Sequence, residues 1–135
     1  MKTIVMVSLA IAISAVSLFA SEPAVKDVNR GEINWNQAEK NYIFSLLIDN
    51  AGVRQSAAGF LAQYNLKGGV EPLIRILEND KVEQVRMAAA LALITIGDSK
   101  ARKAVEDASF YDGSEKVSKF CESLLLASNE KTALK

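Results

Sequence analysis

The chain has 135 residues, with 16 Lys and Arg against 16 Asp and Glu, and is 50% hydrophobic, which suits one globular domain. A formal charge of zero, with acids and bases interspersed, provides no basic field for a phosphate backbone, so we expect no nucleic-acid partner. The sequence contains no His, which excludes catalytic triads with an imidazole base and the usual zinc sites.

Residues 1–20 have the pattern of an export signal. Lys2 gives a positive start, residues 4–19 are apolar apart from three serines, and small Ala20 precedes Ser21, where we expect cleavage. The alternative is an uncleaved membrane anchor, because the apolar stretch is near the lower limit for crossing a bilayer. Cleavage predicts a periplasmic or secreted protein that has no further contact with the membrane.

Residues 21–33 mix charged residues with Pro23 and Gly31 and show no sustained apolar period, so we predict a flexible leader. Beyond it, apolar residues recur with helical spacing, and no segment shows the alternation typical of strands. We therefore predict an all-α domain at 34–129 and a short tail at 130–135. Its six helices are expected at 35–49, 51–64, 70–79, 81–96, 99–109 and 113–128.

Residues that start and stop helices separate these segments. Asp80 with Glu83, and Asp112 with Glu115, have the spacing of a capping box, which predicts that two helices begin there. Pro72 suits the first turn of a helix, where its missing N–H costs nothing. Gly97 and Asn129 suit the left-handed conformation that ends a helix.

The helical pattern repeats with a period of 32 residues. The superposed apolar positions are Val53, Val85 and Val117, then Ala57, Ala89 and Cys121, then Leu61, Leu93 and Leu125. Because one short helix cannot bury its apolar face alone, this equal spacing predicts that helix pairs stack and share a continuous core.

The residues that carry the repeat resemble a known family. The stretch 70–77, a short polar turn, and Val85-Arg86 leading an Ala-rich helix that ends at 96–98 is similar to the HEAT repeats of bacterial proteins, including the HEAT-like class found in phycobilisome lyases. The resemblance implies a short α-solenoid of about three antiparallel helix pairs. It places the helices 51–64, 81–96 and 113–128 on the inner, concave side. Such repeats generally act as interaction scaffolds, so the resemblance favours binding over catalysis.

Arg54 and Arg86 each follow a Val at the start of successive inner helices. By the resemblance they belong to an internal ladder, in which each Arg bonds the turn Asp of a neighbouring unit. The candidate partners are Asp80, Asp112 and Asp49. The alternative is that the two guanidinium groups hold an external carboxylate or phosphate.

A second apolar stripe on the helix 81–96 indicates a binding surface. Met87, Leu91 and Ile94 recur at i, i+4 and i+7, apart from the core stripe of the same helix. We predict a partner-binding groove there, completed by Thr95 and Leu126 and by a polar rim. The rim residues are Gln55, Gln63, Lys119 and Ser123. Two alternatives stay open: the helix is central and buried by its neighbours, or residues 21–33 fold back over the stripe.

Aromatic residues mark two other places. We expect Trp35, with Tyr42 and Phe44 further along, to seal the amino-terminal end of the stack, and Phe110 with Tyr111 to pack the turn between paired helices. The single Cys121 lies on an apolar helical stripe, which favours burial over a bridge to another chain.

No pattern of nucleophile, base or metal ligands predicts an active site, and we expect no cofactor. We therefore predict a small exported scaffold or adaptor that binds a protein or peptide partner through its concave face. The alternatives are a chromophore-handling or lyase-like enzyme that shares the repeat fold, and a structural protein that associates with itself.

Overall fold

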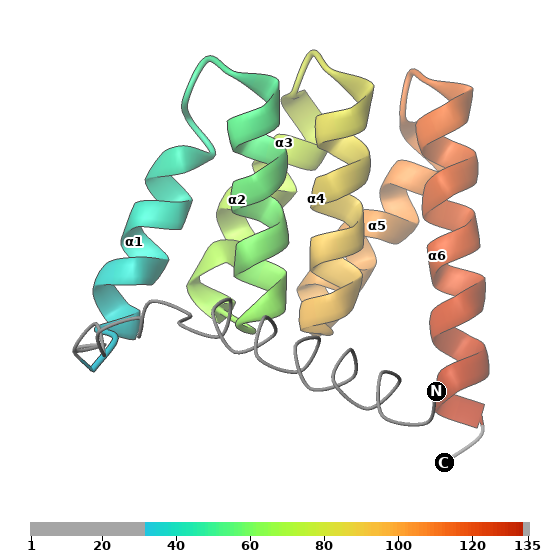
Figure 1. Ribbon diagram of the computed structural model, residues 1–135. Coiled ribbons are helices and arrows are strands. Elements are labelled where there is room, and N and C mark those ends of the chain that lie inside the picture. Colours follow the sequence, from blue (N-terminus) through green and yellow to red (C-terminus); the bar gives the residue numbers. More distant parts are fainter. Residues whose placement is uncertain (1–31, 134–135) are drawn as a thin grey trace, which may run out of the picture. The chain divides into compact units, whose positions relative to one another are not determined.

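The computed structural model describes residues 32–133, so the expected export signal and most of the expected leader lie outside the described residues. This part of the chain contains α-helices and one short 3-10 helix, and no strand (Figure 1). The elements are α1 (Trp35–Ser45), α2 (Ala51–Gln63), η2 (Lys67–Gly69), α3 (Val70–Asn79), α4 (Glu83–Ile96), α5 (Ser99–Tyr111) and α6 (Glu115–Ala133). Within these residues no helix has both the length and the apolar character needed to cross a membrane.

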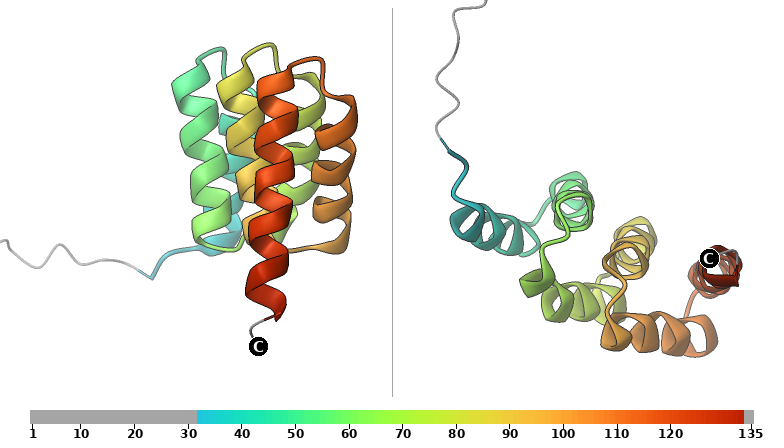
Figure 2. Two further views of the ribbon diagram at one scale, coloured as in Figure 1. Left: turned by 90° about the vertical axis from the view of Figure 1, so that its right-hand side faces the viewer. Right: turned by 90° about the horizontal axis from the view of Figure 1, so that it is seen from below.

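The helices of the domain form two layers. α2, α4 and α6 lie side by side in one layer, and α3 and α5 lie behind them in the other, with α1 beside α2 (Figure 1, Figure 2). α4 packs against α2, α3, α5 and α6, which makes it the central helix of the domain. The expected α-solenoid of three helix pairs is confirmed.

The repeat places equivalent side chains in one core. Ala57, Ala89 and Cys121 are all buried, as are Leu61 and Leu93. Small residues at the first set of positions let neighbouring helices approach closely, and the leucines fill the space between the layers. Burial raises the pKa of the Cys121 thiol to about 11, so this cysteine is an inert core residue, as its stripe predicted.

The capping prediction for Asp80 and Asp112 is wrong. α4 begins at Glu83 and α6 at Glu115, two residues later than expected. Each Asp instead accepts a hydrogen bond from the backbone N–H two residues on, at 2.9 Å for Asp80 and 2.8 Å for Asp112. The turn therefore leaves each carboxylate free to bind an arginine.

Three other helix ends test the sequence pattern. Gly97 ends α4 with a φ of 74°, a left-handed conformation that favours glycine, as predicted. α1 ends at Ser45, earlier than expected, because Leu46 turns into the core. α6 continues through Asn129 to Ala133, so the helical domain extends into the expected tail; the Asn129 side chain accepts a bond from Arg102 and does not stop the helix.

Candidate partner-binding face

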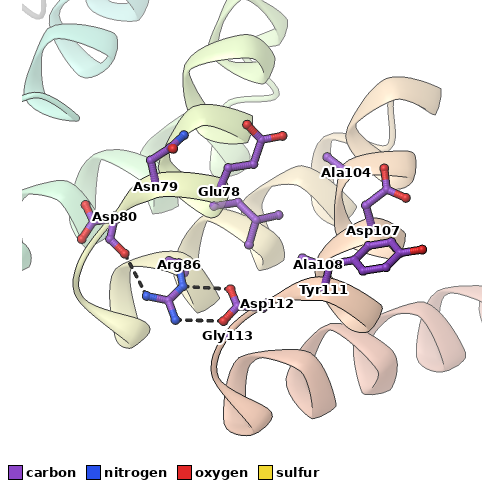
Figure 3. Close-up of a pocket in the computed structure, with 11 residues that line it drawn as sticks. Glu78, Asn79, Asp80, Arg86, Ala104, Asp107, Ala108, Tyr111, Asp112 and Gly113 are labelled. Carbon is purple, nitrogen blue, oxygen red and sulfur yellow. Dashed lines mark hydrogen bonds and ion pairs between the residues drawn. The ribbon is translucent and has the colours of Figure 1, made fainter.

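Two arginines, Arg54 buried and Arg86 largely buried, connect successive helix pairs near the start of the inner helices. Arg54 of α2 donates from Nε and Nη2 to the two carboxylate oxygens of Asp80, at 2.6 and 3.1 Å, and from Nη1 to the carbonyl oxygen of Ile48 at 2.9 Å. Arg86 of α4 repeats this pattern 32 residues later. It donates to both oxygens of Asp112 at 2.9 Å, and to the carbonyl oxygen of Asp80 at 2.8 Å (Figure 3).

The third helix pair closes this ladder with a neutral side chain. Ser118 stands 32 residues after Arg86, and its hydroxyl lies 3.3 Å from the carbonyl oxygen of Ala108 and 3.4 Å from that of Asp112. The serine offers one neutral hydroxyl donor to these carbonyls and buries no unpaired charge.

The charges of the ladder satisfy one another. Burial raises the pKa of the Asp80 and Asp112 carboxyls, but hydrogen bonds from the arginines and from backbone N–H groups outweigh it and bring both pKa values below their usual range. The same hydrogen bonds raise the pKa of Arg54 and Arg86. Both guanidinium groups are committed to internal partners, so the geometry favours the structural ladder over an external anion.

Asp49, the third candidate partner, lies outside the ladder. Its carboxylate is 3.7 Å from the ammonium of Lys81, and both side chains are exposed. A solvated pair of this kind contributes about 0–1 kcal/mol, so Asp49 has no structural part comparable to that of Asp80.

The apolar stripe on α4 divides into covered and exposed residues. Met87 and Ile94 are half-buried against the core, whereas Leu91 between them is 48% exposed. The positions equivalent to Leu91 on the two neighbouring helices are Gly59 of α2 and Ser123 of α6. A Cβ added at Gly59 would meet nothing within 4 Å. The Leu91 side chain therefore protrudes from the surface, because the equivalent positions on both neighbouring helices carry small residues.

Two further residues of the predicted groove are exposed. Thr95 donates its hydroxyl to the carbonyl oxygen of Leu91 at 2.8 Å, one turn back along α4. Leu126 of α6, the equivalent of Ile94, is 60% exposed and lines a hollow between α5 and α6. Four hollows of about 290–470 Å³ on the described domain are lined by other residues than Met87, Leu91 and Ile94, and the partner-binding groove stays a prediction.

The predicted rim residues lie on the two helices that flank α4. Gln63 is exposed and Gln55 is half-buried, both on α2. On α6, Lys119 forms an exposed pair with Glu115 at 2.6 Å, and the Ser123 hydroxyl donates to the Lys119 carbonyl oxygen at 2.9 Å. We name the exposed side of α2, α4 and α6 the ridge face, centred on Leu91.

The structure addresses one of the two alternatives left open for this stripe. α4 is indeed the central helix, and its core residues Val85, Ala89 and Leu93 are buried, but Leu91 is not covered by the adjacent helices. The other alternative, cover by residues 21–33, falls mainly on residues outside the described part of the chain.

An acidic hollow of about 470 Å³ lies between the second and third helix pairs, where Glu78 of α3 and Asp107 of α5 contribute carboxylates (Figure 3). Asp107 is paired with Lys103 at 2.5 Å, and Arg86 in the wall is held by the ladder. A hollow of about 290 Å³ recurs one unit earlier around Arg54. These two spaces accompany the two ladder arginines, and among the described residues no cluster of three or more His, Cys, Asp or Glu side chains could hold a metal ion.

The structure also exposes aromatic residues that the sequence pattern misplaced or missed. Phe110 and Tyr111 are 74% and 82% exposed at the end of α5, so the expectation that they pack the turn is wrong. At the amino-terminal end, the Trp35 ring packs against Tyr64 of α2, with the ring centroids 4.8 Å apart, but Phe44 is 65% exposed, so its expected part in the seal is wrong. The sequence pattern did not single out Phe60, which is exposed on α2. Its equivalent one period later is the buried Ala92, and this difference in size was the available signal that the two positions have different surroundings.

Comparisons with known proteins agree with this architecture. Residues 43–119, more than half of the chain, match the family described as HEAT repeats. The matched range contains both ladder arginines, their Asp partners and Leu91. No curated protein matches the sequence. The repeat, the two-layer fold and this match together establish that the chain belongs to the HEAT-repeat family.

Proposed function

We propose that this protein is a small exported scaffold that binds a protein or peptide partner across the ridge face. HEAT repeats form scaffolds capable of protein interaction, and this chain has that framework. The observation that carries the proposal is the position of Leu91, a large apolar side chain left 48% exposed in the middle of the α2–α4–α6 layer.

The surroundings of Leu91 suit a binding centre. Apolar residues at the middle of a polar surface are the usual anatomy of an interface hot spot. Completing the burial of a leucine contributes about 1.5–3 kcal/mol at most, and Leu126 on α6 supplies a second exposed anchor. The open space above Gly59 leaves room for a side chain of the partner. The flexible side chain of half-buried Met87 adapts to the shape of that partner side chain.

The chemistry of this face selects the class of partner. Its centre is apolar, its predicted rim includes the uncharged Gln55 and Gln63 of α2, and Lys119 is already paired with Glu115 on its own helix. An apolar helix face or an extended segment with apolar anchors fits such a surface, whereas a strongly charged partner gains little from it. The export signal predicted for residues 1–20 supports an encounter in the periplasm or outside the cell.

Site-specific photo-crosslinking in the producing cell tests the ridge face. A photoreactive residue at position 91 should capture a discrete partner protein, while the same residue at Arg75, exposed on α3 in the opposite layer, should not. Identical capture at both positions would show non-specific contact and contradict the proposal.

The variant Leu91→Lys separates binding from folding. Because the Leu91 side chain is half exposed, we expect the circular dichroism spectrum to be unchanged and the melting temperature to fall by only a few degrees. A photoreactive residue at position 126 or 63 of this variant should no longer capture the partner. Unfolding of the variant would instead identify Leu91 as a core residue. Export is tested separately by the mass of the protein recovered from the cell envelope, which should begin at Ser21.

A further inference from the structure

The third helix pair, α5 with α6, is held in the stack by few buried side chains. Those side chains are small: Ala101 and Val105 on α5, and Val117 and Cys121 on α6. In the middle pair, α3 buries four residues and α4 buries six, among them three leucines. The first pair also buries two leucines, one at the end of α1 and one on α2. Because apolar burial drives helix packing, the third pair is the most weakly held of the three.

Positions that form core in the middle pair carry polar residues in the third. Ile74 and Leu77 of α3 are 8% and 1% exposed, whereas Glu106 and Ser109, 32 residues later, line a hollow between α5 and α6. On their other side, α5 and α6 pack against α3 and α4. The polar residues suit a surface that faces water, so the third pair is held from one side.

One charged contact of the ladder joins the third pair to the middle pair. Arg86 of α4 donates to both carboxylate oxygens of Asp112 at 2.9 Å. Its other bond, to the Asp80 carbonyl oxygen, stays within the middle unit. The equivalent contact of Arg54 with Asp80 joins the first pair to the middle pair and involves neither α5 nor α6. Separating the third pair therefore breaks the Arg86 contact and keeps the Arg54 contact.

We propose that α5 and α6 open together as one unit, hinged at Gly97, while the first two helix pairs stay folded. α4 ends at Ile96 and α5 begins at Ser99, so Gly97 and Asp98 connect this unit to α4. Gly97 has a φ of 74°, and a glycine there can change conformation without steric cost. Stacked repeats are stabilised by nearest-neighbour contacts, which allows a unit at one edge to open without the others.

This opening goes beyond the binding proposed for the ridge face and does not depend on it. Cys121, the single cysteine of the chain, is 0% exposed in the closed stack and reaches solvent when the unit opens. Opening also moves α6 away from α4, which removes one side of the ridge face (Figure 2). The third pair thus controls access to the thiol and the integrity of that surface.

Alkylation of Cys121 by iodoacetamide at pH 8 without denaturant, followed by mass spectrometry on the purified protein, measures the opening. The labelling rate is proportional to the open fraction, because the closed thiol is buried. Arg86→Met leaves the Asp112 carboxylate buried without its counterion in the closed state only, since opening returns Asp112 to water. We expect the labelling rate to rise at least about 100-fold.

The matched control is Arg54→Met, the same change one period earlier. It affects Asp80, which lies in the part that stays folded, so the labelling rate should change by less than about threefold. A milder pair of variants retains the fold in case Arg86→Met does not. Val117 and Val85 are equivalent and both 0% exposed. Val117→Ala should raise the rate about tenfold, and Val85→Ala, on α4, by less than about threefold.

Hydrogen exchange gives an independent readout: the amides of α5 and α6 should exchange together and faster than those of α4. Equal acceleration of labelling by Arg54→Met and Arg86→Met would show that the thiol reacts through global unfolding. No acceleration by Arg86→Met and Val117→Ala would show a fluctuation confined to Cys121. Either result would overturn the proposal, as would exchange in α4 as fast as in α5 and α6.

Discussion

Replacing Arg86 with methionine removes the centre of the ladder while keeping most of the aliphatic volume of the side chain. Arg86 connects two units, because it donates to the Asp112 carboxylate and to the Asp80 backbone carbonyl. After the change, the Asp112 side chain, which is only 7% exposed, keeps a single hydrogen bond from the Ser114 N–H. A charge is then left buried without its counterion.

The expected loss of stability comes from that stranded charge. Breaking a buried ion pair by removing one partner costs about 3–5 kcal/mol. Total stability of a domain this size is about 5–15 kcal/mol, so the loss is a large fraction of it. At about 4–8 °C per kcal/mol, the melting temperature should fall by at least about 12 °C. Urea unfolding followed by circular dichroism measures the free energy directly.

Two further variants decide whether the stranded charge is the cause. Arg102→Met removes an exposed arginine that bonds only neutral side chains, and should cost less than about 1 kcal/mol. Adding Asp112→Asn to Arg86→Met removes the buried charge but keeps an oxygen for the Ser114 N–H, so most of the stability should return. A loss for Arg86→Met no greater than for Arg102→Met, or no recovery in the double variant, would refute the reasoning.

Three other outcomes are expected from the core and the ladder. Leu93→Ala, at a fully buried position in the middle unit, should lower the unfolding free energy by about 2–5 kcal/mol in the same urea assay, and a loss below about 1 kcal/mol would place Leu93 outside the core. The pKa values of Asp80 and Asp112 are lowered in the fold, so their contribution is complete above the ordinary value of 3.8 and is lost as the pH falls through the lower folded values. Asp112→Asn should therefore flatten the acid limb of a stability–pH curve, and an unchanged limb would exclude the ladder as its source. Cys121, with a pKa of about 11, should react with iodoacetamide at pH 8 at least about 100-fold more slowly in the folded protein than in urea, and equal rates would mean that the thiol is accessible.

The repeat and most of its structural consequences could be read from the order of the amino acids alone. The 32-residue period and the helical spacing of apolar residues predicted six helices, a shared core and the burial of Leu93 and Cys121. These are properties of each helix and its nearest neighbours, so they are visible along the chain. The ladder itself was expected from the resemblance to HEAT repeats, and of its three candidate partners Asp80 and Asp112 bind the arginines whereas Asp49 does not.

Properties that depend on side chains far apart in the sequence emerged only in the folded chain. Asp80 can cap a helix or bind an arginine, and Arg54, 26 residues away, determines which, because a bidentate charged pair outweighs one cap bond. Likewise, the helical spacing on α4 does not distinguish Leu91 from Met87 and Ile94. Only the small residues that α2 and α6 place at the level of Leu91 leave it exposed, because exposure is set by what neighbouring helices contribute and not by the helix itself.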